Sequence, residues 1–277
     1  MAANRPPFCD GIICGMKTHA LPKFLVAVFV FAVSFVPSGC FRSEDADVRS
    51  YVNGSMTVYE MDGVRNLRDL GGWTGRDGRL VRRGRVFRSG ALNRSYKRWY
   101  RSDKTLPARS RAYLVETLGV KTDVDLRNDQ ECEGMEESPL GSSVVWRHIP
   151  FLAYIQLSTR RGRAAFAEIF RVFLDEANYP ILFHCQLGRD RAGTVAFVLN
   201  ALLGVSEDDL RYDWAFSEWS VGKRNVSFEK IDDLTHVFLP YPGRTLNEKV
   251  EAFVKSLGFT EADIDHFRAL MLEPAVE

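Results

Sequence analysis

The stretch Tyr179–Thr194, YPILFHCQLGRDRAGT, constrains the fold of this chain more than any other part of the sequence. A short apolar run, Ile181–Phe183, leads to His184 and Cys185, and an apolar segment of helical length, Ala192–Leu203, follows a few residues later. This pattern predicts a buried strand, a tight loop and a buried helix. The cysteine is then placed where the strand ends.

The chemistry that such a loop supports follows from its position at the start of a helix. Backbone N–H groups turn inward there, and the positive end of the helix dipole favours an anion. A thiol held at this place is expected to be ionised at neutral pH, which makes Cys185 a candidate nucleophile for phosphoryl transfer. Arg191 can offer its guanidinium fork to two phosphate oxygens. Gly188 lets the loop bend where a side chain would crowd the anion.

The loop resembles a known family. Cys185, Gly188 and Arg191 match the Cys-x5-Arg signature of cysteine-based protein phosphatases. The longer HCQLGRDRAG resembles the tyrosine and dual-specificity branch found in bacteria, whose loop typically has the form HC-x-x-G-K-D-R-T-G. The segments NLRDLGG and DGRLVRRGRVFRSGAL resemble the N-terminal half of the same branch, so the resemblance covers roughly residues 59–273.

The fold class follows from the order of the predicted elements. Strands alternate with helices and a helical C-terminal part follows, which predicts an α/β domain with a mostly parallel central sheet flanked by helices. This agrees with the protein-tyrosine-phosphatase-like fold that the resemblance implies.

The resemblance also implies roles for individual side chains. Cys185 would attack phosphorus while Arg191 and the loop N–H groups bind the equatorial oxygens. A general acid must protonate the leaving oxygen, and Asp190 is the first candidate, with Asp125 as the alternative. His184 either hydrogen-bonds the loop and favours the thiolate or is an ordinary core histidine. The remaining residues expected to contact substrate are Gln186, Leu187, Gly188 and Arg189 in the loop, and Arg88 and Asp69 in the N-terminal half.

Two loop positions depart from the pattern of this branch. Arg189 stands where lysine is usual, so the charge is kept and the shape differs. Ala192 stands where the family has serine or threonine, whose hydroxyl helps the thiolate leave the phospho-enzyme. The missing hydroxyl predicts an effect on turnover rather than on binding.

The N-terminal part has the features of a targeting segment. An apolar run, Phe24–Val36, follows two lysines and is shorter than the roughly 20 residues of a membrane-spanning helix. Pro37–Cys40 resembles a bacterial lipobox, which makes Cys40 a candidate for lipidation. We therefore predict a targeting segment at residues 1–40, a tether at 41–58 and a phosphatase domain at 59–277. The protein would be extracytoplasmic, either anchored to a membrane as a lipoprotein or secreted.

Composition limits the partners. The net charge of +1 gives no indication of nucleic-acid binding. The chain of 277 residues has five cysteines and five histidines, without the spacing of a metal site, and we expect neither a metal nor another cofactor. The expected substrates are phosphorylated proteins or phosphoinositides. Two alternatives stay open: a phytase-like enzyme that acts on inositol polyphosphates, and a phosphate-binding lipoprotein without catalytic activity, which Ala192 would suit.

Overall fold

The computed structural model describes residues 48–93, 106–220, 222 and 227–275. The chain divides into two units, Met1–Glu44 and Asp45–Glu277, and all the described residues belong to the second. The predicted targeting segment, with Cys40, lies outside the described residues. Within the described residues, no helix combines the length and the apolar character needed to cross a membrane.

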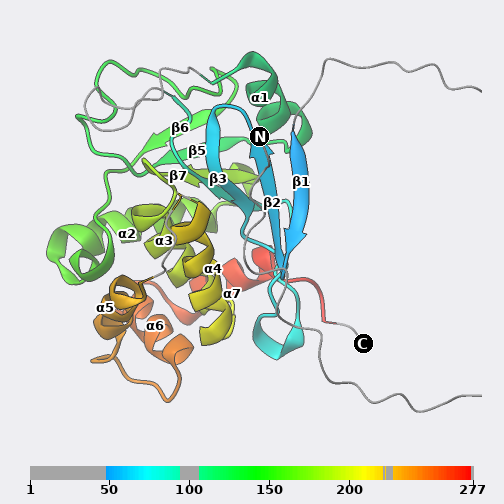
Figure 1. The fold of residues 1–277 in the computed structure, drawn as a ribbon. Helices are drawn as coiled ribbons and strands as arrows, with labels where there is room; N and C mark the ends of the chain where they lie inside the picture. Colours follow the sequence, from blue (N-terminus) through cyan, green and yellow to red (C-terminus); the bar gives the residue numbers. More distant parts are fainter. Residues whose placement is uncertain (1–47, 94–105, 221, 223–226, 276–277) are drawn as a thin grey trace, which may run out of the picture. The chain divides into compact units, whose positions relative to one another are not determined.

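A seven-stranded sheet forms the centre of the second unit, with the strand order β1-β2-β3-β4-β7-β5-β6. The strands β4, β7, β5 and β6 are parallel, whereas β1, β2 and β3 extend the sheet with antiparallel pairings as far as β4 (Figure 1). The α/β class is confirmed, and the parallel part is the part that surrounds the predicted loop. The strand bounds are β1 Arg49–Asn53, β2 Met56–Met61, β3 Val64–Asp69, β4 Val86–Ser89, β5 Thr122–Asp125, β6 Val145–His148 and β7 Ile181–His184.

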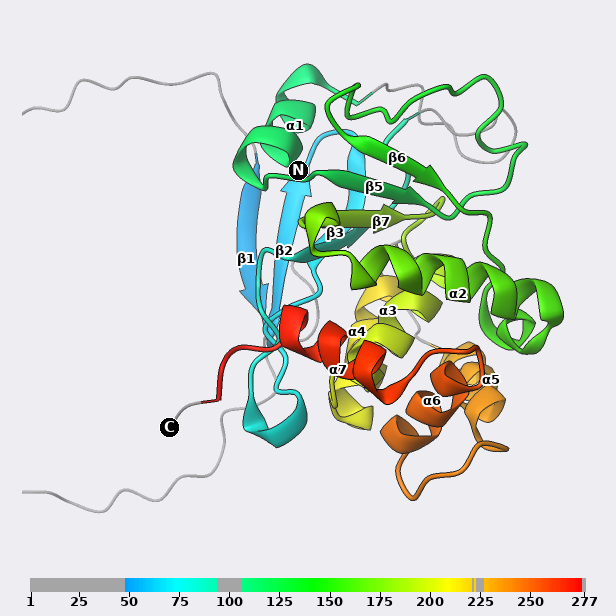
Figure 2. The ribbon, with the colours of Figure 1, turned by 180° about the vertical axis from the view of Figure 1, so that it is seen from behind.

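Helices cover both faces of the sheet (Figures 1 and 2). The larger core cluster joins one face of the sheet to α2 and the helices that follow it, and the smaller cluster joins the other face to the segment after α1. The bounds are α1 Ala108–Ala112, α2 Arg160–Leu174, α3 Asp190–Leu202, α4 Glu207–Ser220, α5 Glu229–Phe238, α6 Leu246–Lys255 and α7 Glu261–Met271. Short helical turns cover Arg76–Gly78, Tyr113–Thr117, Tyr154–Ser158 and Glu176–Asn178.

Strand β7 shows why an unbroken apolar run forms a strand here. Ile181 and Phe183 belong to the larger core cluster, whereas Leu182 between them belongs to the smaller one. Successive side chains of a strand point to opposite faces, and both faces of the sheet are covered at this place. The first three residues of the strand, Ile181–Phe183, are therefore all apolar, whereas an alternating pattern would leave polar groups buried on one face.

The boundary between tether and domain differs from the prediction. Residues 41–58 were expected to be a tether, yet Arg49–Asn53 is β1 and β2 begins at Met56. The two strands pair antiparallel, and Gly54 in the connecting turn has a φ of 60°. The loop between them is the two residues Gly54 and Ser55, and a glycine that opens a two-residue loop is a signal for a tight hairpin. The polar composition of β1 concealed it, because an edge strand needs few apolar residues.

Candidate active site

The loop predicted to hold the nucleophile lies at the carboxyl end of β7, near the middle of the sheet. β7 ends at His184, Cys185 follows it directly, and α3 begins at Asp190. β7 pairs in parallel with β4 on one side and with β5 on the other. The predicted order of strand, loop and helix is confirmed, and the loop lies at the edge where α/β sheets place their sites.

The backbone N–H groups of this loop are suited to an anion. Within the described part of the chain, no protein group accepts a hydrogen bond from the N–H groups of Gln186, Leu187, Gly188 or Arg189. α3 starts directly after them, and its N-terminal end adds partial positive charge. The Cys185 side chain lies at the start of the loop and is 2% exposed. Free N–H groups beside a thiol at a helix N-terminus can bind a tetrahedral dianion.

Gly188 is required by the shape of the loop. Its φ is 67°, and a Cβ atom at this position would lie 2.5 Å from the carbonyl carbon and oxygen of Ser89. Real Cβ atoms do not come this close to a backbone, and the backbone of Ser89 belongs to β4 and cannot shift easily. Glycine is therefore required here by the positive φ and by the backbone of Ser89, whereas the expected crowding of an anion stays a prediction.

Two side chains from the N-terminal half hold the carbonyl side of the loop. Asn66 donates from Nδ2 to the carbonyl oxygens of Leu187, at 3.3 Å, and Gly188, at 3.0 Å. Arg88 donates from Nη2 to the Gly188 oxygen at 2.8 Å. With these carbonyl groups engaged on one side, the adjoining N–H groups stay available for a ligand.

A buried cluster of charges lies behind these contacts. Asp213 of α4 accepts from Arg68 Nε at 2.8 Å with one carboxylate oxygen and from Arg88 Nη1 with the other. Both arginine side chains are completely buried. Burial would raise the pKa of Asp213, but the two guanidinium groups hold it below its usual range. One buried carboxylate thus holds two buried arginines, one of which reaches the loop.

Arg88 and Asp69 differ from the predicted substrate contacts. The guanidinium group of Arg88 is buried and bound to Asp213 and to the loop carbonyl, so it supports the loop from behind. Asp69 accepts from the backbone N–H groups of Gly71 at 2.7 Å and Gly84 at 2.6 Å. Burial raises the pKa of Asp69 to about 6. Asp69 therefore stabilises a turn, because its carboxylate satisfies backbone donors that the chain would otherwise bury unpaired.

Arg191 lies at the loop and already has a carboxylate partner. Its Nη1 and Nη2 donate to the two carboxylate oxygens of Glu131, at 2.6 Å and 2.9 Å. Burial would lower the pKa of Arg191, but the contact with Glu131 raises it further above neutrality. This paired geometry fixes the plane of the guanidinium fork, which is the group expected to bind phosphate oxygens.

Asp190 opens α3 and lies among three polar groups. Tyr154 donates its hydroxyl to Oδ1, Arg189 donates to Oδ2 at 3.0 Å and 3.1 Å, and Lys230 Nζ lies 3.3 Å from Oδ1. Burial would raise the pKa of Asp190, but these partners lower it. The side chain is 27% exposed, so it can still meet a ligand in the loop. Arg189 also lies 3.4 Å from Glu218 of α4.

Asp125 and His184 form a second, fully buried group. Arg127 donates to both oxygens of Asp125, with the shortest contact 2.6 Å from Nη2 to Oδ2. Burial would raise the pKa of Asp125, but His184 and Arg127 lower it. His184 lies 3.0 Å from Asp123 and 3.8 Å from Asp125. Burial would lower the pKa of His184, but these carboxylates raise it. His184 therefore has the contacts of a core histidine. The carboxylates of Asp123 and Asp125 in β5 offset the cost of burying its ring.

The position where the family has a serine or threonine lies in the core of this protein. Ala192 is completely buried. The nearby Thr194 donates its hydroxyl to the Asp190 carbonyl oxygen at 3.0 Å and accepts from the Tyr154 N–H at 3.1 Å. The hydroxyl of Thr194 is thus committed to the start of α3 and to the turn at Tyr154. It does not replace the group missing at Ala192.

Sequence reasoning missed several residues that build this site. The missed side chains are Asn66, Glu131, Tyr154 and Asp213. Two weak signals existed: Asn66 opens the NLRDLGG segment, and Asp213 is an acidic residue between Tyr212 and Trp214 in a helix. Neither signal indicates the loop as a partner, because Asn66 lies 122 residues from Gly188 in sequence. Among the described residues, no group of three or more His, Cys, Asp or Glu side chains could hold a metal ion.

Comparison with known proteins identifies the family. A model of the tyrosine phosphatase family matches residues 59–273, and the chain belongs to this family. The resemblance deduced from the loop is thereby confirmed.

Two curated relatives have similar sequences. A predicted tyrosine-protein phosphatase of Cupriavidus necator, H16_A0669, is 30% identical over 195 residues, which are 61% of this chain and 64% of that protein. A tyrosine-protein phosphatase of Nostoc commune is 25% identical over 140 residues, 43% of this chain and 47% of the relative. The chain therefore spans between about half and two thirds of the length of these relatives.

Solved structures of similar proteins are more distant. The core catalytic domain of the PP-IP phosphatase SIW14 of S. cerevisiae is 16% identical, with a TM-score of 0.37 and coverage of 56% of this chain and 79% of that one. TpbA of P. aeruginosa is 20% identical, with a TM-score of 0.36 and coverage of 69% and 88%.

Proposed function

We propose that the protein hydrolyses phosphate monoesters, with phosphotyrosine in proteins as the main substrate, through a phosphocysteine intermediate. The observation that carries this proposal is the loop after Cys185, whose N–H groups have no acceptor within the described part of the chain. A nucleophilic sulfur at such a cradle suits a phosphoryl group. Membership of the tyrosine phosphatase family supports the same reaction.

In the first step, the Cys185 thiolate attacks phosphorus. The S–P bond forms as the P–O bond to tyrosine breaks, and the electron pair of that bond goes to the leaving oxygen. The loop N–H groups and Arg191 stabilise the negative charge on the equatorial oxygens. A proton from a general acid converts the leaving oxygen to the tyrosine hydroxyl.

Asp190 is the better candidate for this acid. Its side chain is partly exposed at the end of the loop, whereas Asp125 is buried and bound on both oxygens by Arg127. The Asp125 side chain is completely buried, so its carboxylate is closed to a substrate. The dianion of the substrate, close to Asp190, would favour the protonated form that the acid needs, because like charges raise the pKa of a carboxyl group.

In the second step, water attacks the phosphocysteine. The O–P bond forms, the S–P bond breaks, and the thiolate and inorganic phosphate are released. Asp190, ionised after the first step, accepts the proton of the water. Since Ala192 provides no hydroxyl to stabilise the departing thiolate, this second step is expected to limit turnover.

Other substrates and a purely binding role are the alternatives, and the assays described below distinguish them. Phosphoinositides and inositol polyphosphates present the same monoester to the loop, and a lipoprotein that only binds phosphate would use the same N–H groups.

Lipidation of Cys40, with an extracytoplasmic membrane location, is part of this proposal and rests on the sequence of residues 1–40. Mass spectrometry of the protein from bacterial membranes would detect the lipid.

A panel of substrates tests the proposal. The full-length protein in detergent is assayed with p-nitrophenyl phosphate, phosphotyrosine peptides, phosphoserine peptides, phosphoinositides and phytate, with a chelator present. We expect phosphotyrosine peptides to be hydrolysed fastest. Cys185→Ser should abolish turnover and keep tungstate binding, and Cys132→Ser, which changes the other buried thiol of the described residues, should keep turnover. Tungstate binding without any hydrolysis by the unmodified protein would favour the non-catalytic alternative.

A further inference from the structure

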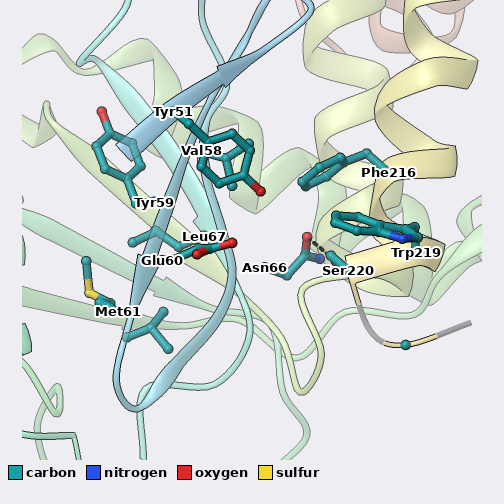
Figure 3. A pocket seen from close by; sticks show the side chains of 12 residues that line it. Tyr51, Val58, Tyr59, Glu60, Met61, Asn66, Leu67, Phe216, Trp219 and Ser220 are labelled. Atoms are coloured by element: carbon teal, nitrogen blue, oxygen red, sulfur yellow. Dashed lines mark hydrogen bonds between the residues drawn. The ribbon is translucent and has the colours of Figure 1, made fainter. Parts of the chain in front are cut away.

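A cavity of about 350 Å³ lies beside the catalytic loop (Figure 3). It lies between the strands β1 to β3 and the C-terminal part of α4. In Figure 3, Tyr51 and Glu60 on the strand side face Phe216 and Trp219 on the helix side. The mechanism described above uses neither side of this cavity.

The cavity lies at the same edge of the sheet as Cys185. β3 is antiparallel to β4 and therefore starts at the edge where β4 ends, and β2 in turn ends there with Glu60 close to its last residue. α4 reaches this edge with its C-terminal end, since Glu218 lies 3.4 Å from Arg189 in the loop. A substrate whose phosphate occupies the loop would thus meet the cavity at the same end of the domain.

The Asn66 side chain links the cavity to the loop. Asn66 lines the cavity and donates to the carbonyl oxygens of Leu187 and Gly188. Ser220, another lining residue, donates to Asn66 Oδ1 at 2.7 Å. An extended peptide advances about 3.3 Å per residue. A side chain within a few residues of the phosphotyrosine can therefore reach the cavity.

The lining has the chemistry of a site for a cation. Glu60 supplies a negative charge, and Tyr51 and Trp219 supply aromatic faces, which attract cations. The Phe216 ring already has the guanidinium of Arg68 at 5.2 Å, and one side of the Trp219 ring packs against Phe216. A cation would therefore meet the other side of Trp219 and the Tyr51 ring, whose hydroxyl lies beside the Glu60 carboxylate. The C-terminal end of α4, which ends at Ser220, adds partial negative charge. The lining residues within the described part of the chain include no lysine or arginine.

We propose that this cavity is a subsite for a lysine or arginine side chain of the phosphoprotein substrate, close in sequence to the phosphotyrosine. This inference rests on the proposed phosphatase function and adds a sequence preference to it. A cavity with a carboxylate and no basic lining residue would repel the additional phosphates of an inositol polyphosphate. The subsite therefore favours proteins over such substrates.

Paired peptides test the subsite. Phosphotyrosine peptides that differ in a single residue, lysine or glutamine, are compared with that residue placed in turn at successive positions on both sides of the phosphotyrosine. At one position or two, lysine should raise kcat/KM about tenfold over glutamine, the scale of a cation–π contact combined with a partly exposed ion pair. The readout is the lysine-to-glutamine ratio within one protein, so changes in folding or in the loop cancel.

Variants assign the preference to the cavity. Glu60→Gln should reduce the ratio to near one, and Glu168→Gln, an exposed glutamate of α2, should keep it. Equal rates for all peptide pairs, or a lysine preference that survives Glu60→Gln, would overturn the subsite while hydrolysis itself stands. The absence of hydrolysis for every peptide and for p-nitrophenyl phosphate would instead overturn the proposed function, and the subsite with it.

Discussion

Replacing Asp213 by asparagine removes one negative charge and almost no volume from the cluster behind the loop. The carboxylate binds Arg68 and Arg88, both completely buried. Burial and the neighbouring Arg68 lower the pKa of Arg88 only to about 10, so Arg88 stays charged at pH 7. Removing one partner from a buried ion pair costs roughly 3–5 kcal/mol. Because a domain is stabilised by only about 5–15 kcal/mol, Asp213→Asn should cost a large part of the stability.

Urea denaturation followed by circular dichroism measures this change. Asp233→Asn, an exposed aspartate of α5, is the matched control and should change the free energy of unfolding by less than about 0.5 kcal/mol. Tungstate binding to the folded Asp213→Asn protein should also weaken, since Arg88 would no longer hold the Gly188 carbonyl oxygen in place.

The pH dependence provides the sharper criterion. The pKa of Asp213 is lower in the folded protein than in the unfolded chain, where it is about 3.9. Its stabilising effect is therefore present above pH about 4 and is lost as the pH falls through the folded-state value. The difference in stability between the unmodified protein and Asp213→Asn should shrink below pH 4. A loss of less than about 1 kcal/mol at pH 7, or a difference independent of pH, would refute this account of the cluster.

Two more predictions concern the loop itself. Gly188→Ala should abolish tungstate binding and cost about 2 kcal/mol or more of stability, because the methyl group adds a clash with Ser89 to the strain of a left-handed conformation. The control is Gly78→Ala: Gly78 has a φ of 72° and no atom within 4 Å of the place that the added methyl group would take, so this variant should show the cost of the strain alone. Asp190→Asn should slow tyrosine phosphate hydrolysis about 100-fold or more, but p-nitrophenyl phosphate much less, because p-nitrophenol leaves without a proton. Because the contacts of Asp190 lower its pKa, turnover of tyrosine phosphate should fall as the pH rises from acidic to neutral, and the variant should lack this slope. An equal loss for both substrates would rule Asp190 out as the general acid.

The sequence by itself determined the nucleophile loop. The run Ile181–Phe183 predicts a strand buried on both faces, and the segment after Arg191 is mostly apolar on all sides, as is typical of a fully buried helix. Gly188 lies between them at the place where the φ is positive and a Cβ would clash. These features are local, so the spacing of residues within one stretch is enough to predict them.

Only the tertiary structure decided how this loop is supported. Arg88 and Asp69 looked alike as polar residues near a strand, yet Arg88 reaches Gly188, 100 residues away in sequence, while Asp69 binds the turn next to it. Asp213 joins Arg68 to Arg88 only because α4 packs on β3, the strand next to β4 in the sheet. Such contacts depend on strand register and helix packing, and a buried charge has no periodicity that reveals its partner. The sequence therefore determined where the chemistry lies, and the packing of distant elements decided which charges hold it in place.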